Sequence, residues 1–159
     1  MKKSIIGLFA ATALLTASAA ELNWLTDAAK AQAQAKTENK LVLLDFTGSD
    51  WCGWCIKLNK EVFNTPEFAE YAKKNLVLVE VDFPRRKKLS DEQKQANEAL
   101  SKKYGVEGFP TLILLDGNGK KLGELSYSDG VEKTENMDRS KLTAKPAPFI
   151  AAIEKKRKG

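Results

Sequence analysis

The chain contains two cysteines, Cys52 and Cys55, which lie three positions apart in the segment "SDWCGWC" at residues 49–55. Such a pair can form a structural disulfide, ligate a metal, attach a haem covalently, or exchange disulfides with another molecule. The 159 residues include no histidine, which removes the side chain used most often as a general base and as a metal ligand. The chemistry of this chain must therefore be sought in the two thiols.

Three of the four kinds of chemistry fit the sequence poorly. A disulfide that closes so short a loop adds only about 2 kcal/mol in the chain-entropy model. A structural zinc site needs four ligands, so two would have to be carboxylates or come from another subunit. Covalent haem needs a histidine directly after the second cysteine, and Ile56 is there instead. Haem is excluded, whereas a structural disulfide and a metal site remain open as alternatives.

Thiol–disulfide exchange fits the spacing best. A helix predicted over residues 52–63 places both side chains on one face, with Cα atoms within the ~4.4–6.8 Å that a disulfide needs. Cys52 then lies at the helix N-terminus, where unpaired N–H groups and the helix dipole stabilise a thiolate and lower its pKa. We expect Cys52 to be the nucleophile that forms a mixed disulfide, and Cys55 to be the thiol that resolves it.

The elements that must position this pair alternate along the chain. Strands are predicted over residues 41–46, 76–81, 111–115 and 121–125, and further helices over residues 27–37, 66–75, 90–104 and 146–158. The residues "DGNG" between the last two strands indicate a hairpin. Strands separated by helices predict parallel crossovers, followed here by one antiparallel hairpin. The polar segment 126–144 and the basic segment 83–90, "FPRRKKLS", are expected to be loops.

The first twenty residues differ from the rest of the chain. A basic start is followed by an uncharged apolar run over residues 5–15 and by small residues before Ala20. This arrangement is typical of a secretory signal peptide cleaved after Ala20 or Ala19, and the run is too short to span ~30 Å of hydrocarbon. We therefore predict a signal peptide over residues 1–20 and one domain over residues 21–159.

Export would place the protein in the periplasm or outside the cell, where a disulfide can persist. Cleavage removes Lys2 and Lys3 and lowers the net charge from +5 to +3. A charge this small gives no reason to expect nucleic-acid binding.

At this point the chain resembles the thioredoxin family. The strand "LVLLDF" followed by "WCGWC" is similar to that family's strand and redox motif, and "YGVEGFPTLILLDGNGKKLGEL" at residues 104–125 is similar to its second signature. The resemblance covers residues 39–125 and the final helix, and is greatest to exported, single-domain members. It implies a thioredoxin-like α/β fold with three α/β/α layers, a mixed central sheet of four to five strands, and protein-disulfide oxidoreductase activity.

The resemblance also implies roles for individual residues. Pro110 matches the family's cis-proline, which faces the redox pair, and Phe109 would then bind an extended substrate segment through its backbone. The alternative for Phe109 is an aromatic side chain in the core. Asp45 matches a buried aspartate that exchanges protons with the second cysteine. One extra residue separates Asp45 from Cys52 in comparison with thioredoxin, so a solvated aspartate at the strand end is the alternative.

The tryptophans beside the cysteines are expected to contact substrate, although Trp54 could equally pack against the domain. Gly53 and Trp54 replace the Gly-Pro of thioredoxin and the Pro-His of the strongly oxidising DsbA type. With no histidine beside Cys52, we expect a reductant, with an oxidant, an isomerase or a non-catalytic binding module as alternatives.

The expected partners are proteins that contain disulfides. No nucleotide-binding motif or other cofactor motif is present, so no cofactor and no metal are expected. A membrane-bound electron donor is then implied, because the oxidised pair must be reduced again. The insert 83–101 is basic at residues 85–88 and is interpreted as a solvated loop, with the steering of acidic partners as the alternative.

Overall fold

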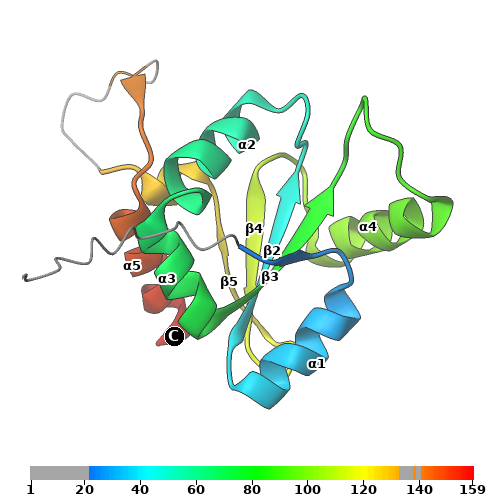
Figure 1. Ribbon diagram of the computed structural model, residues 1–159, viewed down its shortest axis with the longest axis horizontal. Coiled ribbons are helices and arrows are strands. Elements are labelled where there is room, and N and C mark those ends of the chain that lie inside the picture. Colours follow the sequence, from blue (N-terminus) through cyan, green and yellow to red (C-terminus); the bar gives the residue numbers. More distant parts are fainter. Residues whose placement is uncertain (1–21, 133–137, 139–140) are drawn as a thin grey trace, which may run out of the picture.

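The computed structural model describes residues 22–132, 138 and 141–159 (Figure 1). The predicted signal peptide and its cleavage sites lie outside the described residues. In chain order the elements are β1 (Trp24–Leu25), α1 (Ala28–Glu38), β2 (Leu41–Thr47), α2 (Gly53–Leu58), a π-helical turn η1 (Asn59–Phe63), α3 (Pro66–Asn75), β3 (Leu76–Asp82), α4 (Asp91–Tyr104), β4 (Thr111–Leu115), β5 (Lys121–Leu125), a 3₁₀ turn η2 (Tyr127–Gly130) and α5 (Pro146–Arg157).

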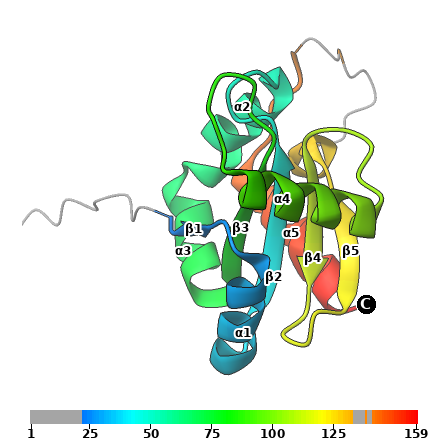
Figure 2. The ribbon, with the colours of Figure 1, turned by 90° about the vertical axis from the view of Figure 1, so that its right-hand side faces the viewer.

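Within the described residues, five strands form one mixed sheet in the order β1-β3-β2-β4-β5. β2 and β3 are parallel, β4 is antiparallel to β2, and β5 is antiparallel to β4. The prediction that strands separated by helices run parallel is correct for β2 and β3 but wrong for β4. Helix α4 crosses the strands instead of running back along them (Figure 2), so the chain enters β4 at the end of the sheet where β3 finishes.

The sequence patterns missed the edge strand β1. It contains only Trp24 and Leu25, which pair in parallel with Leu78 and Val79 of β3. Two residues are too few to show the alternation of apolar and polar side chains by which a strand is recognised. The strand is recognised only from its pairing with β3.

Local signals explain where the helices begin and end. Asp27, Thr65 and Ser90 each accept hydrogen bonds from backbone N–H groups of the first turn of α1, α3 and α4, respectively. Asn39 and Gly105 end α1 and α4 in the left-handed conformation, with φ of 54° and 65°. These caps account for the agreement between the predicted and observed bounds to within one or two residues.

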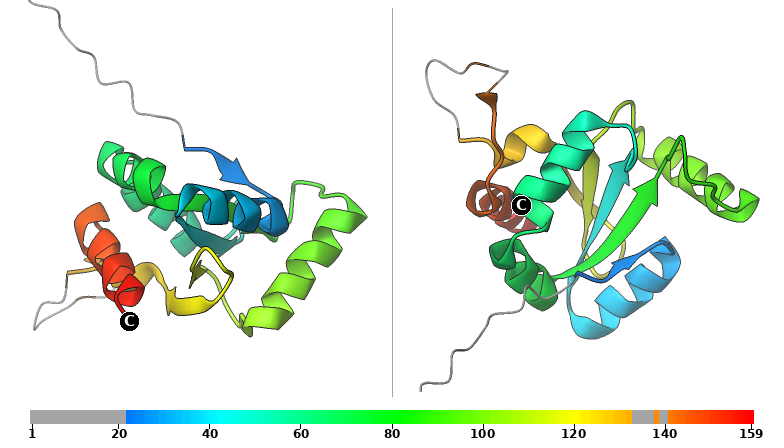
Figure 3. Two further views of the ribbon diagram at one scale, coloured as in Figure 1. Left: turned by 90° about the horizontal axis from the view of Figure 1, so that it is seen from below. Right: turned by 45° about the horizontal axis from the view of Figure 1, so that its top comes forward.

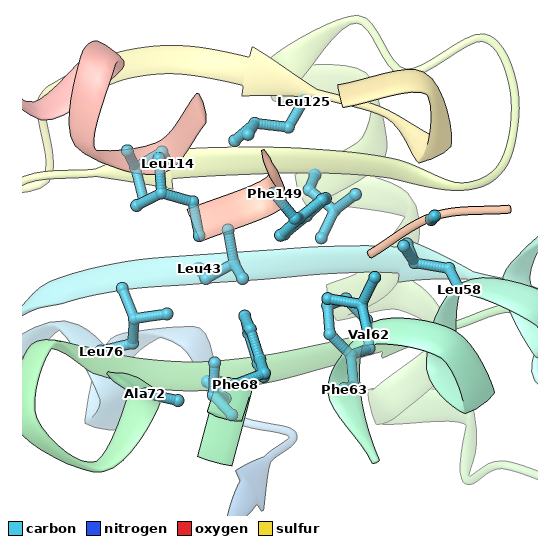
Figure 4. Close-up of a cluster of buried hydrophobic side chains, with 14 of the residues drawn as sticks. Leu43, Leu58, Val62, Phe63, Phe68, Ala72, Leu76, Leu114, Leu125 and Phe149 are labelled. Atoms are coloured by element: carbon cyan, nitrogen blue, oxygen red, sulfur yellow. The ribbon is translucent and has the colours of Figure 1, made fainter. Parts of the chain in front are cut away.

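The helices cover the sheet on both faces, so the expected three-layer α/β/α fold with a mixed sheet is confirmed (Figure 3). α2, α3 and α5 lie on one face, and α1 and α4 lie on the other. On the first face Phe149 of α5 contacts Phe63 and Phe68, with ring centroids 5.9 and 6.1 Å away, over Leu43 of β2 (Figure 4). This cluster supports α2, on which the redox pair lies.

The segment predicted as a loop after β5 contains some regular structure. Turn η2 follows β5 directly, and Val131 forms an isolated antiparallel bridge with Ala144. Residues 133–137 and 139–140 lie outside the described part of the chain. The bridge leads the chain back to the start of α5.

Candidate active site

Cys52 and Cys55 are joined by a disulfide at the start of α2, with their Cα atoms 5.3 Å apart. Cys52 is the N-cap residue of α2, and its Sγ accepts a hydrogen bond from the backbone N–H of Cys55 at 3.2 Å. The exposed fraction is 7% for Cys52 and 4% for Cys55. Of the pair, Cys52 is therefore the more accessible and is the sulfur that accepts a backbone N–H of the helix.

The turn from β2 into α2 sets the position of the pair. The carbonyl of Gly48 accepts hydrogen bonds from the N–H groups of Trp51 and Cys52, at 3.1 and 2.8 Å. A Cβ atom at position 48 would lie only 2.5 Å from Cε2 of Trp51. Glycine is thus required at position 48 because the indole ring folds back over its own turn.

Three aromatic side chains, including that of Trp51 directly before Cys52, pack against one another. Nε1 of Trp51 donates to the carbonyl of Phe83 at 2.8 Å, and the ring of Trp51 meets the edge of Phe109 with centroids 6.0 Å apart. Phe83 stacks on Phe109 at 5.2 Å. The peptide bond from Phe109 to Pro110 is cis. Trp51, which precedes the redox pair, therefore packs against Phe109, which precedes Pro110. The side chain of Phe109 is half-buried.

Asp45 lies inside the protein. Its exposed fraction is 7%, and its buried Oδ1 has no hydrogen-bond partner among the described residues. Burial, reinforced by the nearby carboxylates of Glu80 and Asp82, raises the pKa of Asp45 to about 8. The alternative of a solvated aspartate at the strand end does not hold, because β2 continues past this position and lies between β3 and β4.

One pocket, with a volume of about 330 Å³, is lined by both Asp45 and Cys55. Glu80 of β3, Lys60 and other residues of β2 and η1 also line it. An unpartnered carboxyl group and the second cysteine therefore share a polar space.

Two further acids, Glu80 and Asp82, lie close enough to Asp45 to affect its ionisation, and no sequence motif predicted them. Glu80 pairs with Asp45 across the parallel strands, so the two side chains point to the same face of the sheet. Burial and the charge of Asp82 raise the pKa of Glu80, which is only half-buried. Glu80 lies inside the apolar run "LVLVEVD", as Asp45 lies inside "LVLLDF", so an acid within an apolar strand is the signal that could have found it.

Trp54 is both exposed and packed. It is 45% exposed, while its ring lies 4.8 Å from that of Tyr127 and Nζ of Lys57 lies 5.5 Å from its centroid. The hydroxyl of Tyr127 donates to Glu61 at 2.6 Å. Burial and this hydrogen bond raise the pKa of Tyr127 to about 12. Trp54 therefore packs against Tyr127 and also leaves part of its surface exposed, two residues after Cys52 in the chain.

Two further properties of the described residues concern metals and membranes. No group of three or more carboxylate, thiol or imidazole side chains there could hold a metal ion. Among the same residues, no helix combines the length and the apolar character needed to cross a bilayer.

The chain belongs to the family described as thioredoxin-like domain, whose profile matches residues 28–138. It is similar to the disulfide bond reductase DsbH of Chlamydia pneumoniae, with 41% identity over 113 residues that make up 71% of this chain and 68% of that protein. A solved structure described as DsbH oxidoreductase superposes with a TM-score of 0.73 at 32% identity, covering 98% of this chain and 95% of the other.

A second relative is the thioredoxin-related protein DsbJ of Chlamydia pneumoniae, with 32% identity over 117 residues. The match covers 74% of this chain and 33% of DsbJ. With the disulfide at the start of α2, these similarities make the protein a thiol–disulfide oxidoreductase of the Dsb type, that is, a protein-disulfide oxidoreductase.

Proposed function

We propose that the protein reduces disulfide bonds in other exported proteins, with Cys52 as the nucleophile and Cys55 as the resolving thiol. The observation that carries the proposal is the pocket shared by Asp45 and Cys55, because the resolving thiol must lose a proton before it can react. The direction is supported by the similarity to a disulfide bond reductase and by the absence of an imidazole next to Cys52.

The first step is attack by the Cys52 thiolate on one sulfur of a substrate disulfide. A bond forms between Cys52 Sγ and that sulfur, and the other substrate sulfur leaves as a thiolate that takes a proton from water. The N–H groups at the start of α2 favour the thiolate form of Cys52. In this proposal the exposed ring of Trp54, together with Trp51 and the Phe109–Pro110 backbone that packs near it, would supply the surface for the substrate.

The second step releases the substrate. Cys55 gives its proton to the carboxylate of Asp45 and attacks Sγ of Cys52, so that the Cys52–Cys55 disulfide forms and the bond between Cys52 and the substrate breaks. The remaining substrate sulfur leaves as a thiolate that takes a proton from water, and Asp45 returns its proton to the solvent. The substrate gains two electrons and two protons, and the enzyme loses them. An acid with a pKa of about 8 is well matched to this transfer near neutral pH.

The oxidised enzyme must then be reduced again. The chain has no second pair of thiols and no cofactor motif, so a separate donor has to supply two electrons. We propose a membrane-bound donor on the outer side of the cytoplasmic membrane, in keeping with residues 1–20 acting as a signal peptide. The reduced enzyme would then work in the periplasm.

The proposal is tested by two measurements on the mature protein. In an insulin-reduction assay with dithiothreitol, Cys52→Ser should lose all turnover, whereas Cys55→Ser should accumulate a mixed disulfide detectable by mass spectrometry. Equilibration with glutathione should then give a reduction potential near about −270 mV, which is typical of a thioredoxin reductant. A potential near about −120 mV would make the protein an oxidant and contradict the proposed direction.

A further inference from the structure

The basic loop after β3 is bound to the redox site. Residues 83–89 connect β3 to the cap of α4, and four consecutive cationic side chains in this loop are exposed. We name these four the basic rim: Arg85, Arg86, Lys87 and Lys88. The loop and the turn before α2 both lie at the carboxyl ends of β2 and β3 (Figure 1).

Asp50 holds the loop in place. Its carboxylate accepts hydrogen bonds from three consecutive backbone N–H groups, those of Arg85 at 2.9 Å, Arg86 at 2.7 Å and Lys87 at 3.1 Å. The bond from Arg85, followed by those from Arg86 and Lys87, keeps the pKa of Asp50 below its usual value. A loop with three such bonds to one carboxylate has a defined path, unlike the solvated loop favoured by the sequence.

The side chains of the basic rim reach the residues that precede Cys52. The guanidinium of Arg85 lies 3.9 Å from the ring centroid of Trp51, and Nη2 of Arg86 donates to the carbonyl of Asp50 at 2.9 Å. Nζ of Lys87 donates to Oγ of Ser49 at 3.2 Å. Three of the four cations therefore border the turn that carries the redox pair.

The positive charge of the basic rim is poorly compensated. None of its four side chains forms a salt bridge within the described part of the chain. Asp50, which binds the backbone of the loop, keeps its negative charge and offsets one of the four cations. Asp82 is buried and accepts hydrogen bonds from Ser49, and Glu80 is half-buried and feels the charge of Lys87. The exposed charge of the loop is therefore predominantly positive.

We propose that the basic rim is a docking surface for an acidic segment of the protein substrate that flanks its disulfide. The inference rests on the proposed function and specifies the class of substrate. Complementary charge raises the rate of encounter and orients the partner, and a rim with a defined path loses little conformational freedom on binding. The advantage for acidic substrates should therefore appear in kcat/KM and should decrease with added salt.

The test compares peptides that carry the same disulfide between flanks of four Glu, four Gln or four Lys residues. For the wild-type protein at low ionic strength, we expect kcat/KM to be about tenfold higher for the acidic than for the neutral peptide. The combined variant Arg86→Gln, Lys87→Gln and Lys88→Gln should reduce this ratio to about two. Arg85 is kept because its side chain also covers Trp51.

A matched control removes the same amount of charge elsewhere. Lys73→Gln, Lys74→Gln and Lys155→Gln change exposed residues in the last turns of α3 and α5, which lie at the opposite end of the sheet. This variant should keep the wild-type ratio. Equal losses in both variants, or a wild-type ratio near one, would overturn the proposal, because the preference would then reflect net charge alone or would not exist.

A binding measurement separates this inference from the proposed function. The oxidised protein is titrated with cysteine-free acidic and neutral peptides, and the affinity is followed by tryptophan fluorescence. A preference of about tenfold for the acidic peptide, lost in the rim variant, supports the docking surface even if reduction of the disulfide peptides fails. Equal affinity for both peptides refutes the docking surface even if the protein reduces insulin.

Discussion

At the scale of single residues, the ionisation of Asp45 links the redox site to the stability of the domain. An unfolded chain loses the proton of this side chain near its ordinary pKa of 3.8, whereas the folded protein holds it up to a pKa of about 8. Across that interval the unfolded state binds fewer protons than the folded state, so stability falls as the pH rises.

We therefore predict that Asp45→Asn stabilises the protein, and by more at pH 8 than at pH 5. The neutral amide removes the cost of a buried carboxylate, so the advantage should grow over this interval by up to about 4 kcal/mol. Urea unfolding of the oxidised proteins at the two pH values measures it. Parallel stability profiles for the variant and the wild-type protein would show that Asp45 titrates normally.

Asp45→Asn should also slow the release of the mixed disulfide, although it stabilises the folded protein. Without the carboxylate of Asp45, Cys55 must give its proton to water, and release of the mixed disulfide should slow about 10²-fold at pH 7. The deficit should stay constant up to about pH 8 and shrink above it, because the carboxylate of the wild-type protein is then fully formed while hydroxide continues to increase. Rapid acid quench followed by alkylation measures the rate, and Asp91→Asn on the exposed start of α4 is the control. An unchanged rate would remove Asp45 from the mechanism.

Much of the site could be predicted at this scale, because its signals are local. The spacing of Cys52 and Cys55 and the acid within the strand of Asp45 are both visible in short segments. The pairing of Glu80 with Asp45 depends on the register of β2 against β3, which no single segment contains. The extra residue between Asp45 and Cys52 left open whether Asp45 is buried or solvated, and the central position of β2 in the sheet shows that it is buried.

At the scale of elements, the attachment of the 83–89 loop depends on Asp50. Asp50→Ala removes the acceptor for three backbone N–H groups, so the loop should open locally while the sheet stays intact. Hydrogen–deuterium exchange should become at least about tenfold faster at residues 85–87 and stay unchanged in α1. Unchanged exchange at residues 85–87 would mean that the side-chain contacts of Arg85 and Arg86 are sufficient.

The elements themselves were mostly predictable, for reasons that differ between helices and strands. Caps such as Asp27 and Ser90 mark helix ends in the sequence. The direction of β4 was predicted wrongly, because a helix between two strands usually returns the chain to its starting end, whereas α4 crosses the sheet. The docking of the basic loop was missed for a similar reason, since its partner Asp50 lies 35 residues earlier.

At the scale of the whole molecule, one face of the sheet contains both a large part of the hydrophobic core and the pocket of Asp45. The face under α2, α3 and α5 contains the core cluster around Phe149 and, at the carboxyl end of β2, the pocket of Asp45. Phe149→Ala should lower the free energy of unfolding by about 3–5 kcal/mol, because the side chain is fully buried against Phe63 and Phe68.

Chemical denaturation measures this loss, and the reduction potential of the folded variant should match that of the wild-type protein. A stability change below about 1 kcal/mol would indicate that α5 contributes little to the core. A changed potential would instead show that packing around α5 reaches the cysteines.

The way in which Asp50 binds its loop has a consequence for how this protein can diverge. The carboxylate recognises main-chain N–H groups, which every amino acid except proline provides. Positions 86–88 can thus change from basic to neutral or acidic without changing the route of the polypeptide, whereas Arg85 also packs on Trp51. The path of the loop and its charge depend on different residues, so relatives could acquire new substrates by altering three side chains while the sulfur chemistry is inherited intact.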